Sequence, residues 1–119
     1  MSKFVDVYLL PLAESKLEAY RDLAQKCSAY FLKYGATRYR EYAAADMNAP
    51  DLVAFPQIVK LEPGETLIYA AVEYDSEERR NEAMKAIMND TEMAKLCGEE
   101  PLFDFHRMVY GGFSILVDE

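Results

Sequence analysis

The sequence predicts a single α+β domain over residues 1–119 with a ferredoxin-like fold, in which a split β-α-β-β-α-β arrangement gives an antiparallel sheet with its helices on one face. Three observations predict this class. Four segments alternate in the way strands do, segments with helical spacing of apolar residues follow the first and third of them, and the length is usual for one domain. Apolar residues make up 51% of the chain, with nine Tyr and six Phe, which indicates a folded core.

The first strand and helix follow from spacing. Residues 3–11 alternate with a period of two, and Pro11 is expected to end the strand. From about residue 14 to residue 34, apolar residues recur three and four positions apart, which predicts an amphipathic helix. Gly35 then stands where a left-handed C-terminal cap belongs.

The middle of the chain predicts two strands separated by a long connection. Residues 37–46 form a polar strand that suits a sheet edge. The connection over 47–65 holds three of the five prolines, and a short extended piece is expected at 58–61. Residues 66–74 alternate again and predict the third strand.

The last third predicts a helix, a shorter helix and a strand. Ser76 is the expected N-cap of the first of these, and acidic residues follow in its first turn. Thr91 is the expected cap of a short helix that ends at Gly98. Residues 106–117 predict the last strand, in which Gly111-Gly112 indicates either a bulge or a close backbone contact.

Both faces of the predicted sheet are apolar, although two helices can cover only one. The face expected under the helices carries Val5, Val7, Leu9, Ile68, Val72, Val109, Phe113 and Ile115. The opposite face is expected to carry Phe4, Tyr8, Leu10, Tyr39, Leu67, Tyr69, Met108 and Tyr110. Covering several hundred Å² of apolar surface contributes on the order of 10 kcal/mol before association costs. We therefore expect a homodimer with two sheets packed face to face.

Charge and composition exclude several classes of protein. The net charge is −8, and Arg38 and Arg40 are followed at once by Glu41, so no basic surface for nucleic acid is expected. No apolar run approaches the roughly 20 residues of a membrane helix. The N-terminal stretch carries Asp6 and lacks the basic region and cleavage site of a signal peptide, so a cytoplasmic location is expected.

Several segments together carry a family resemblance. They are the opening FVDVYLLPL and KLEAYRDLA, the central YREYAAAD, the block FPQIVKLEPGETLIYAAVEY and the closing FDFHRMVYGGFSILV. The strongest pieces are Phe55-Pro56 with Lys60, and Arg107-Met108 followed by Tyr110-Gly111-Gly112-Phe113. In their order and spacing they resemble the YbaA-like family of uncharacterised bacterial proteins, a domain of unknown function in the dimeric α/β-barrel superfamily.

This resemblance covers residues 3–117 and implies a fold rather than an activity. It implies a ferredoxin-like homodimer whose sheets enclose a barrel-like space. The superfamily includes cofactor-free monooxygenases, ring-opening isomerases and haem enzymes, and transfer of any such activity would rest on fold analogy alone. The chain departs from the family where a Gly-Lys pair is usual, because Phe105 and His106 stand there.

A candidate pocket follows from carboxylates among tyrosines on the face expected to be enclosed. A carboxylate desolvated there could act as a general base, and His106 or Arg107, which as neighbours point to opposite faces, could supply the counter-charge. The alternative is that the acids form structural ion pairs with arginine or lysine. The candidates are Asp6, Tyr8, Tyr39, Glu41, Tyr69, Glu73, His106, Arg107 and Tyr110.

No motif assigns a cofactor or a reaction. One histidine and scattered carboxylates do not make a metal or haem pattern, and Gly111-Gly112 lacks the spacing of a dinucleotide site, so neither a metal nor a cofactor is expected. We therefore expect a small-molecule binding protein or a cofactor-independent enzyme with a pocket at the sheet or dimer interface. The alternative is a non-catalytic structural or interaction homodimer, and the sequence does not decide whether the protein is an enzyme.

Overall fold

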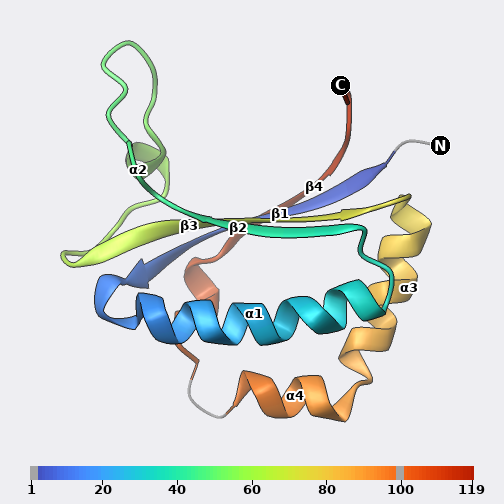
Figure 1. Ribbon diagram of the computed structural model, residues 1–119. Coiled ribbons are helices and arrows are strands. Elements are labelled where there is room, and N and C mark those ends of the chain that lie inside the picture. Colours follow the sequence, from blue (N-terminus) through green and yellow to red (C-terminus); the bar gives the residue numbers. More distant parts are fainter. Residues whose placement is uncertain (1–2, 99–100) are drawn as a thin grey trace.

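The computed structural model describes residues 3–98 and 101–119 and is built on a four-stranded antiparallel sheet. The strands run in the order β2-β3-β1-β4 across the sheet (Figure 1). This order, with the first and third strands adjacent at the centre, is the predicted ferredoxin-like arrangement. The strands are β1 (Phe4–Ala13), β2 (Arg38–Ala43), β3 (Glu65–Tyr74) and β4 (Val109–Ser114).

β1 continues beyond the proline that was expected to end it. Pro11 lies opposite Leu67 of β3, and the strand runs to Ala13. Since β4 pairs with β1 only as far as Leu9, β1 is an edge on that side by the time the chain reaches Pro11. A proline is tolerated at such an edge because no partner strand needs its missing N–H.

Helices were predicted at the correct places, with corrections at their ends. The longer helices are α1 (Leu17–Lys33), α3 (Glu77–Met88) and α4 (Thr91–Cys97), and a short 3-10 turn, η1 (Glu14–Lys16), precedes α1. The side chain of Ser76 accepts a hydrogen bond from the N–H of Arg79, as expected of an N-cap. The cap of α4 is Asp90 instead of Thr91, because its carboxylate accepts the N–H groups of two first-turn residues.

The long connection contains one helical turn, α2 (Phe55–Ile58), instead of an extended piece at 58–61. The turn starts with the N–H of Ala54 donating to the side chain of Gln57 over 2.7 Å. Pro56 lies in the first turn, where its missing N–H leaves no helical bond unmade. Apolar spacing gave no signal for so short a helix.

The last strand is shorter than the predicted 106–117. His106 and Arg107 belong to a 3-10 turn, η2 (Phe105–Arg107), which Asp104 caps by accepting the N–H of His106. Gly111 and Gly112 pair in regular register with β1, so there is no bulge. The close contact is real at Gly112, where an added Cβ would lie 2.6 Å from Cζ of Phe4.

The two faces of the sheet are the reverse of the expected ones on β1, β2 and β4, whereas the residues of β3 lie on the expected faces. Phe4 and Tyr74, opposite one another on β1 and β3, form a buried cluster with Ala83 of α3. Leu10 packs with Tyr20 of α1 in a second cluster. The even-numbered residues of β1 therefore lie under the helices and the odd-numbered ones on the open face. Alternation shows which residues of one strand share a face, but it shows neither the register between strands nor which face the helices cover.

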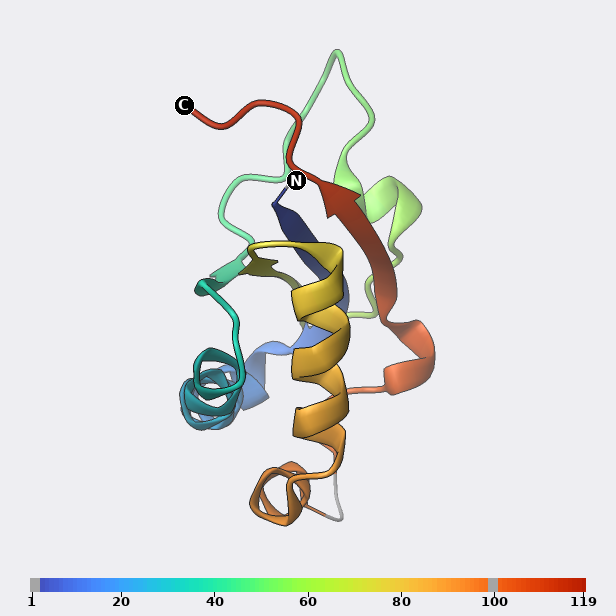
Figure 2. The ribbon, with the colours of Figure 1, turned by 90° about the vertical axis from the view of Figure 1, so that its right-hand side faces the viewer.

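The helices α1, α3 and α4 lie on one side of the sheet (Figures 1 and 2). α1 runs along the sheet, α3 runs away from it, and α4 lies beyond α1 (Figures 1 and 2). The segment around α2 and the C-terminal end rise on the other side, beyond the open face (Figures 1 and 2). Within the described part of the chain, no helix has the length and apolar character needed to cross a membrane.

Candidate functional site

Glu41 is the polar centre of the helix-covered face. It lies in the middle of β2, opposite Ala70 of β3. The hydroxyl of Tyr20, from α1, donates to one oxygen of its carboxylate, and the hydroxyl of Tyr39 donates to the other. Tyr20 is on the apolar stripe of α1, which turns its ring toward the sheet. A helix and a strand thus hold this carboxylate from two directions.

An apolar cavity of about 290 Å³, called here the inner cavity, opens beside this group. Its walls are the helix-covered face of the sheet, the sheet-facing side of α1, Met93 of α4 and the segment from Pro101 to Met108. Glu41 is the one charged side chain among its described lining residues. Six aromatic rings line it: Tyr8, Tyr20, Phe31, Tyr39, Phe103 and Phe105.

A second hollow of about 400 Å³, the outer hollow, lies between α1 and the β2 edge of the sheet. Arg21 and Arg40 line it, and neither lines the inner cavity. Both spaces are bounded by Tyr20, Tyr39 and Glu41. The hydrogen-bonded group of Glu41 and its two tyrosines is therefore part of the wall between them.

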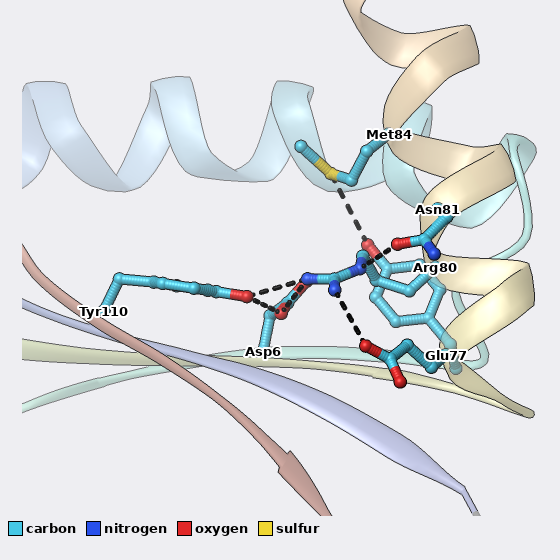
Figure 3. A network of polar contacts seen from close by, with 7 residues as sticks. Asp6, Glu77, Arg80, Asn81, Met84 and Tyr110 are labelled. Carbon is cyan, nitrogen blue, oxygen red and sulfur yellow. Dashed lines mark hydrogen bonds and ion pairs between the residues drawn. The ribbon is translucent and has the colours of Figure 1, made fainter.

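Asp6 forms a second polar cluster, one row further along the same face. One carboxylate oxygen accepts a hydrogen bond from Arg80 of α3 over 2.8 Å and another from Tyr110 of β4 over 2.6 Å (Figure 3). The Arg80 guanidinium also lies over the ring of Phe4, 4.5 Å from its centroid. The side chain of Asp6 is only 1% exposed, so the arginine compensates a buried charge.

The other oxygen of Asp6 is buried with no hydrogen-bond partner among the described residues. A buried unsatisfied oxygen is costly unless a water or ligand atom reaches it. Asp6 does not line the inner cavity, although Tyr8, two positions further along β1, does. The Asp6 cluster is thus adjacent to the cavity without forming its wall.

The tyrosines around these carboxylates are held in their neutral form. Burial, with the negative charge of Asp6 second, raises the pKa of Tyr8 to about 12. Burial and the charge of Glu41 raise the pKa values of Tyr20 and Tyr39 well above the usual range. These hydroxyls are therefore hydrogen-bond donors at neutral pH and not bases.

The structure brings together five of the nine predicted site residues on one face. Asp6, Tyr8, Tyr39, Glu41 and Tyr110 all lie on the helix-covered face. Tyr69 and Glu73 lie on the open face, because residues of β3 opposite the odd-numbered positions of β1 point that way. Tyr69 there meets the ring of Tyr42 at 5.5 Å between centroids.

Arg107 has a structural partner, although it is Glu65 and not one of the candidate carboxylates. Its two terminal nitrogens donate to the two oxygens of Glu65, each over 2.8 Å, and one also donates to the carbonyl of Lys60 over 3.0 Å. The hydrogen bond from Arg107 lowers the pKa of Glu65 to about 2. The side chain of His106 is exposed in η2. Neither residue lines the inner cavity.

Three side chains that matter here were not among the predicted site residues. Arg80 precedes the buried Ala83 and Ile87 of α3 by three and seven positions, so helical spacing could have placed it on the core-facing side. Tyr20 was assigned to the apolar stripe of α1, but its partner on β2 was not visible from spacing. Phe103 lies in a segment without periodicity, and nothing in the sequence indicated that it would line a cavity.

Metal binding finds no support in the arrangement of possible ligands. Among the side chains that the structure describes, no group of three or more from His, Cys, Asp or Glu is placed to hold a metal ion. The polar groups that the structure does bring together are carboxylates with phenols and guanidinium groups.

Comparison with known proteins identifies the family of the chain and solved structures with a similar fold. The chain is 36% identical over 117 residues to the "Uncharacterized protein YbaA" of Escherichia coli K12. The aligned region covers 98% of this chain and 99% of that protein. A crystal structure of a dimeric ferredoxin-like protein from an uncultured marine organism matches with a TM-score of 0.64 at 7% identity, over 100% of both chains. SnoaB, a cofactor-independent oxygenase from Streptomyces nogalater, matches with a TM-score of 0.53 at 11% identity, over 99% of this chain and 97% of that one.

The two structural matches share the architecture at low sequence identity, so they support the ferredoxin-like fold and nothing finer. The family follows from the sequence instead. A family model described as "Protein of unknown function (DUF1428)" matches residues 3–105, and the relative in Escherichia coli matches over nearly the whole chain. The chain belongs to the DUF1428 family.

Proposed function

We propose that the protein binds a small organic molecule in the inner cavity, either as a binding protein or as a cofactor-independent enzyme. The observation that carries this proposal is the cavity itself, about 290 Å³ of apolar space with a single carboxylate held in place by two tyrosine hydroxyls. Small-molecule sites have this composition, mostly apolar walls with a few fixed polar groups, and volumes from roughly 300 Å³ upward.

Each part of the cavity has a chemical role in this proposal. The aromatic walls bury the body of the ligand and supply most of the affinity. Glu41 fixes its orientation by accepting a hydrogen bond. If the protein is an enzyme, the same carboxylate is the group able to take a proton from the ligand, since the surrounding tyrosines are neutral donors. The likeness to a cofactor-independent oxygenase supports an enzymatic role by fold analogy only.

Blocking the cavity tests the proposal. Ala24 of α1 lines the inner cavity and also the outer hollow, whereas Ala29 of the same helix is exposed. A library of aromatic fragments, screened by ligand-observed NMR, should yield compounds that bind the wild-type protein and Ala29→Phe but not Ala24→Phe. The absence of any binding fragment, or equal binding to all three proteins, would reject the cavity as a ligand site.

We also infer a homodimer formed through the open face of the sheet, opposite the cavity. That face carries Arg38, Arg40 and Glu73 but is otherwise largely apolar, and its exposed or half-exposed apolar side chains are Val5, Val7, Leu9, Tyr42, Tyr69, Ala71, Val109 and Phe113. Leu52 and Ile58, near α2, are 77% and 74% exposed on the same side. A second copy of this chain, related by a two-fold axis, can cover such a face with an equally apolar one.

A charge placed at the centre of the open face tests the dimer. Val7 lies between Ala71 and Gly111 there, so Val7→Lys should leave a species of 13.6 kDa in sedimentation experiments, with the wild type at twice that mass. Ala29→Lys adds the same charge to the exposed side of α1 and should remain dimeric. A wild-type protein that sediments as the single chain at micromolar concentration would reject the dimer.

The second candidate function is a non-catalytic structural or interaction homodimer. The exposed apolar face favours it, because that feature needs a partner and not a ligand. The two experiments separate the candidates. Dimerisation through Val7 without fragment binding in the inner cavity would favour this second function.

A further inference from the structure

We infer that the ligand of the inner cavity is an organic cation, a positively charged amino group on an aromatic or other apolar body. The inference rests on the proposed function and names the class of ligand for the same cavity. It comes from the charge of Glu41, the groups around it and the position of the nearby arginines.

Glu41 carries a carboxylate that no described cation compensates. None of the ion pairs among the described residues includes it, whereas Arg80 pairs with Asp6 and Arg107 with Glu65. Its hydrogen-bond partners are the two neutral hydroxyls of Tyr20 and Tyr39. A carboxylate at the wall of an apolar space is stabilised by an opposite charge at short distance more than by neutral donors alone.

The carboxylate can accept further hydrogen bonds. Two carboxylate oxygens offer about four acceptor positions, and the tyrosines occupy one on each oxygen. An ammonium group supplies both an N–H donor and a positive charge. An alcohol of the same shape supplies only the donor, and a ligand carboxylate would be repelled. The site should therefore rank ligands by the charge of the head group.

The aromatic walls favour the same charge. The faces of aromatic rings attract ammonium groups within about 6 Å, more strongly when water is excluded. Phe31 and Tyr39, with ring centroids 5.4 Å apart, and Tyr20 and Phe103, with centroids 5.9 Å apart, line the cavity beside Glu41. The net charge of −8 adds a long-range attraction for cations.

Two arginines lie close in the fold but do not line the inner cavity. Arg21 and Arg40 line the outer hollow, and Arg40, opposite Ala71 of β3, belongs to the open face of the sheet. Arg21 is also paired with Glu18, 3.1 Å away. A cation in the inner cavity meets Glu41 without meeting either guanidinium group. An anionic ligand would instead be drawn to the outer hollow.

Three probes of similar shape test the inference. They are the cation of 2-(naphthalen-2-yl)ethylamine, the neutral alcohol 2-(naphthalen-2-yl)ethanol, and the carboxylate anion of (naphthalen-2-yl)acetic acid, called the acetate below. Isothermal titration calorimetry at pH 7 and physiological ionic strength, where long-range attraction is screened, measures their affinities. We expect the amine to bind about tenfold or more tighter than the alcohol, because a charge-assisted hydrogen bond is roughly twice as strong as a neutral one and the rings add a cation–π contribution. The acetate should bind more weakly than the alcohol.

Matched variants assign the preference to Glu41. Glu41→Gln should remove most of the preference for the amine over the alcohol, leaving only the part that comes from the aromatic rings. Glu73→Gln removes the same charge from the open face and should keep the ratio of the wild type. Tyr39→Phe removes a donor from Glu41 but keeps the charge, so the amine-to-alcohol ratio should rise. This third variant tests the inference even if Glu41→Gln does not fold, which circular dichroism reports.

The outcomes distinguish this inference from the proposed function. Equal or tighter binding of the alcohol or the acetate overturns the cationic ligand and leaves the cavity as a ligand site. An amine preference that Glu73→Gln abolishes as fully as Glu41→Gln overturns it too, because general charge attraction would then explain the preference. If no probe binds, the cationic ligand is rejected, and the fragment screen with Ala24→Phe decides separately whether the cavity binds anything.

Discussion

At the scale of single residues, Asp6 shows how the helix-covered face tolerates a buried charge. Its side chain is 1% exposed, and the paired side chain of Arg80 is 18% exposed, so most of the ion pair is removed from water. Tyr110 donates to the same carboxylate oxygen and also accepts from Arg80 over 2.7 Å. The three side chains come from β1, α3 and β4 and connect elements that are distant in sequence (Figure 3).

Replacing Asp6 should therefore destabilise the fold. Asp6→Asn leaves the guanidinium of Arg80 without its charge partner, and removal of one partner of a buried pair costs roughly 3–5 kcal/mol. Urea unfolding followed by circular dichroism measures the loss. Tyr110→Phe, which removes one hydrogen bond and keeps the ion pair, should cost less, about 1 kcal/mol. An Asp6→Asn protein as stable as the wild type would mean that the pair contributes little.

The sequence predicted which residues lie in the candidate site better than it predicted which groups they contact. Asp6, Tyr8, Tyr39, Glu41 and Tyr110 were assigned to one face and share it, whereas Tyr69 and Glu73 were assigned to it and lie on the other. The period of a strand fixes the face within that strand, but the register between strands decides which residues of different strands share a face. The partners that define their chemistry could not be predicted. Tyr20 reaches Glu41, and Arg80 reaches Asp6, from helices whose position over the sheet depends on tertiary packing.

At the scale of elements, the pairing of β4 with β1 depends on a missing side chain. Gly112 lies opposite Asp6, and an added Cβ would meet Cζ of Phe4 at 2.6 Å and the hydroxyl of Tyr110 at 3.1 Å. Phe4 is buried against Val72 and Tyr74 and has little room to move. Gly112 thus allows β4 to approach the core closely.

Gly112→Ala should destabilise the protein by about 1–3 kcal/mol, the usual cost of inserting a methyl group into a packed region. Thermal unfolding of the purified variant measures this. Gly111→Ala is the matched control, since its Cβ would meet only the ring of Phe113, which is exposed and can shift. Equal stability of the two variants would contradict the close contact at Gly112.

The ion pair between Glu65 and Arg107 ties the start of β3 to η2 and gives a pH prediction. Arg107 lowers the pKa of Glu65 from 4.5 to about 2. Because the folded pKa lies below the unfolded one, the stabilisation is present above about pH 4.5 and is lost as pH falls toward 2. Glu65→Gln should therefore unfold with a shallower dependence on pH across that range in acid titrations followed by circular dichroism. The same dependence in both proteins would contradict the pairing.

The order of the elements was predictable and several of their ends were not. Apolar spacing and the turn residues located all four strands and the three longer helices. The errors arose where local signals competed with tertiary structure. Pro11 breaks a central strand but not the part of β1 that β4 leaves unpaired, and His106 and Arg107 alternate like a strand but form a 3-10 turn capped by Asp104.

At the scale of the whole molecule, the single chain leaves surface uncovered. Its radius of gyration is 15.2 Å, against roughly 13.5 Å for a compact domain of this length. The excess agrees with α3 running away from the sheet and with the α2 segment rising on the other side (Figures 1 and 2). An apolar second face was predictable from the sequence, but which residues it carries depended on the position of the helices.

The inner cavity and the open face lie on opposite sides of the sheet, so changes to one should leave the other intact. Since the cavity lies on the helix-covered face and Val7 on the open face, Val7→Lys should lose the dimer yet keep the binding of 2-(naphthalen-2-yl)ethylamine within about twofold in calorimetry. A monomeric, folded Val7→Lys protein that no longer binds this amine would place part of the site at the dimer interface.

The most direct test locates a bound probe within the fold. Intermolecular nuclear Overhauser effects between 2-(naphthalen-2-yl)ethylamine and the protein identify the aromatic rings that touch it. Binding in the inner cavity predicts contacts to Tyr20, Tyr39 and Phe103 beside Glu41. Contacts to Tyr69 and Phe113 instead would move the site to the open face and contradict a ligand cavity beneath α1.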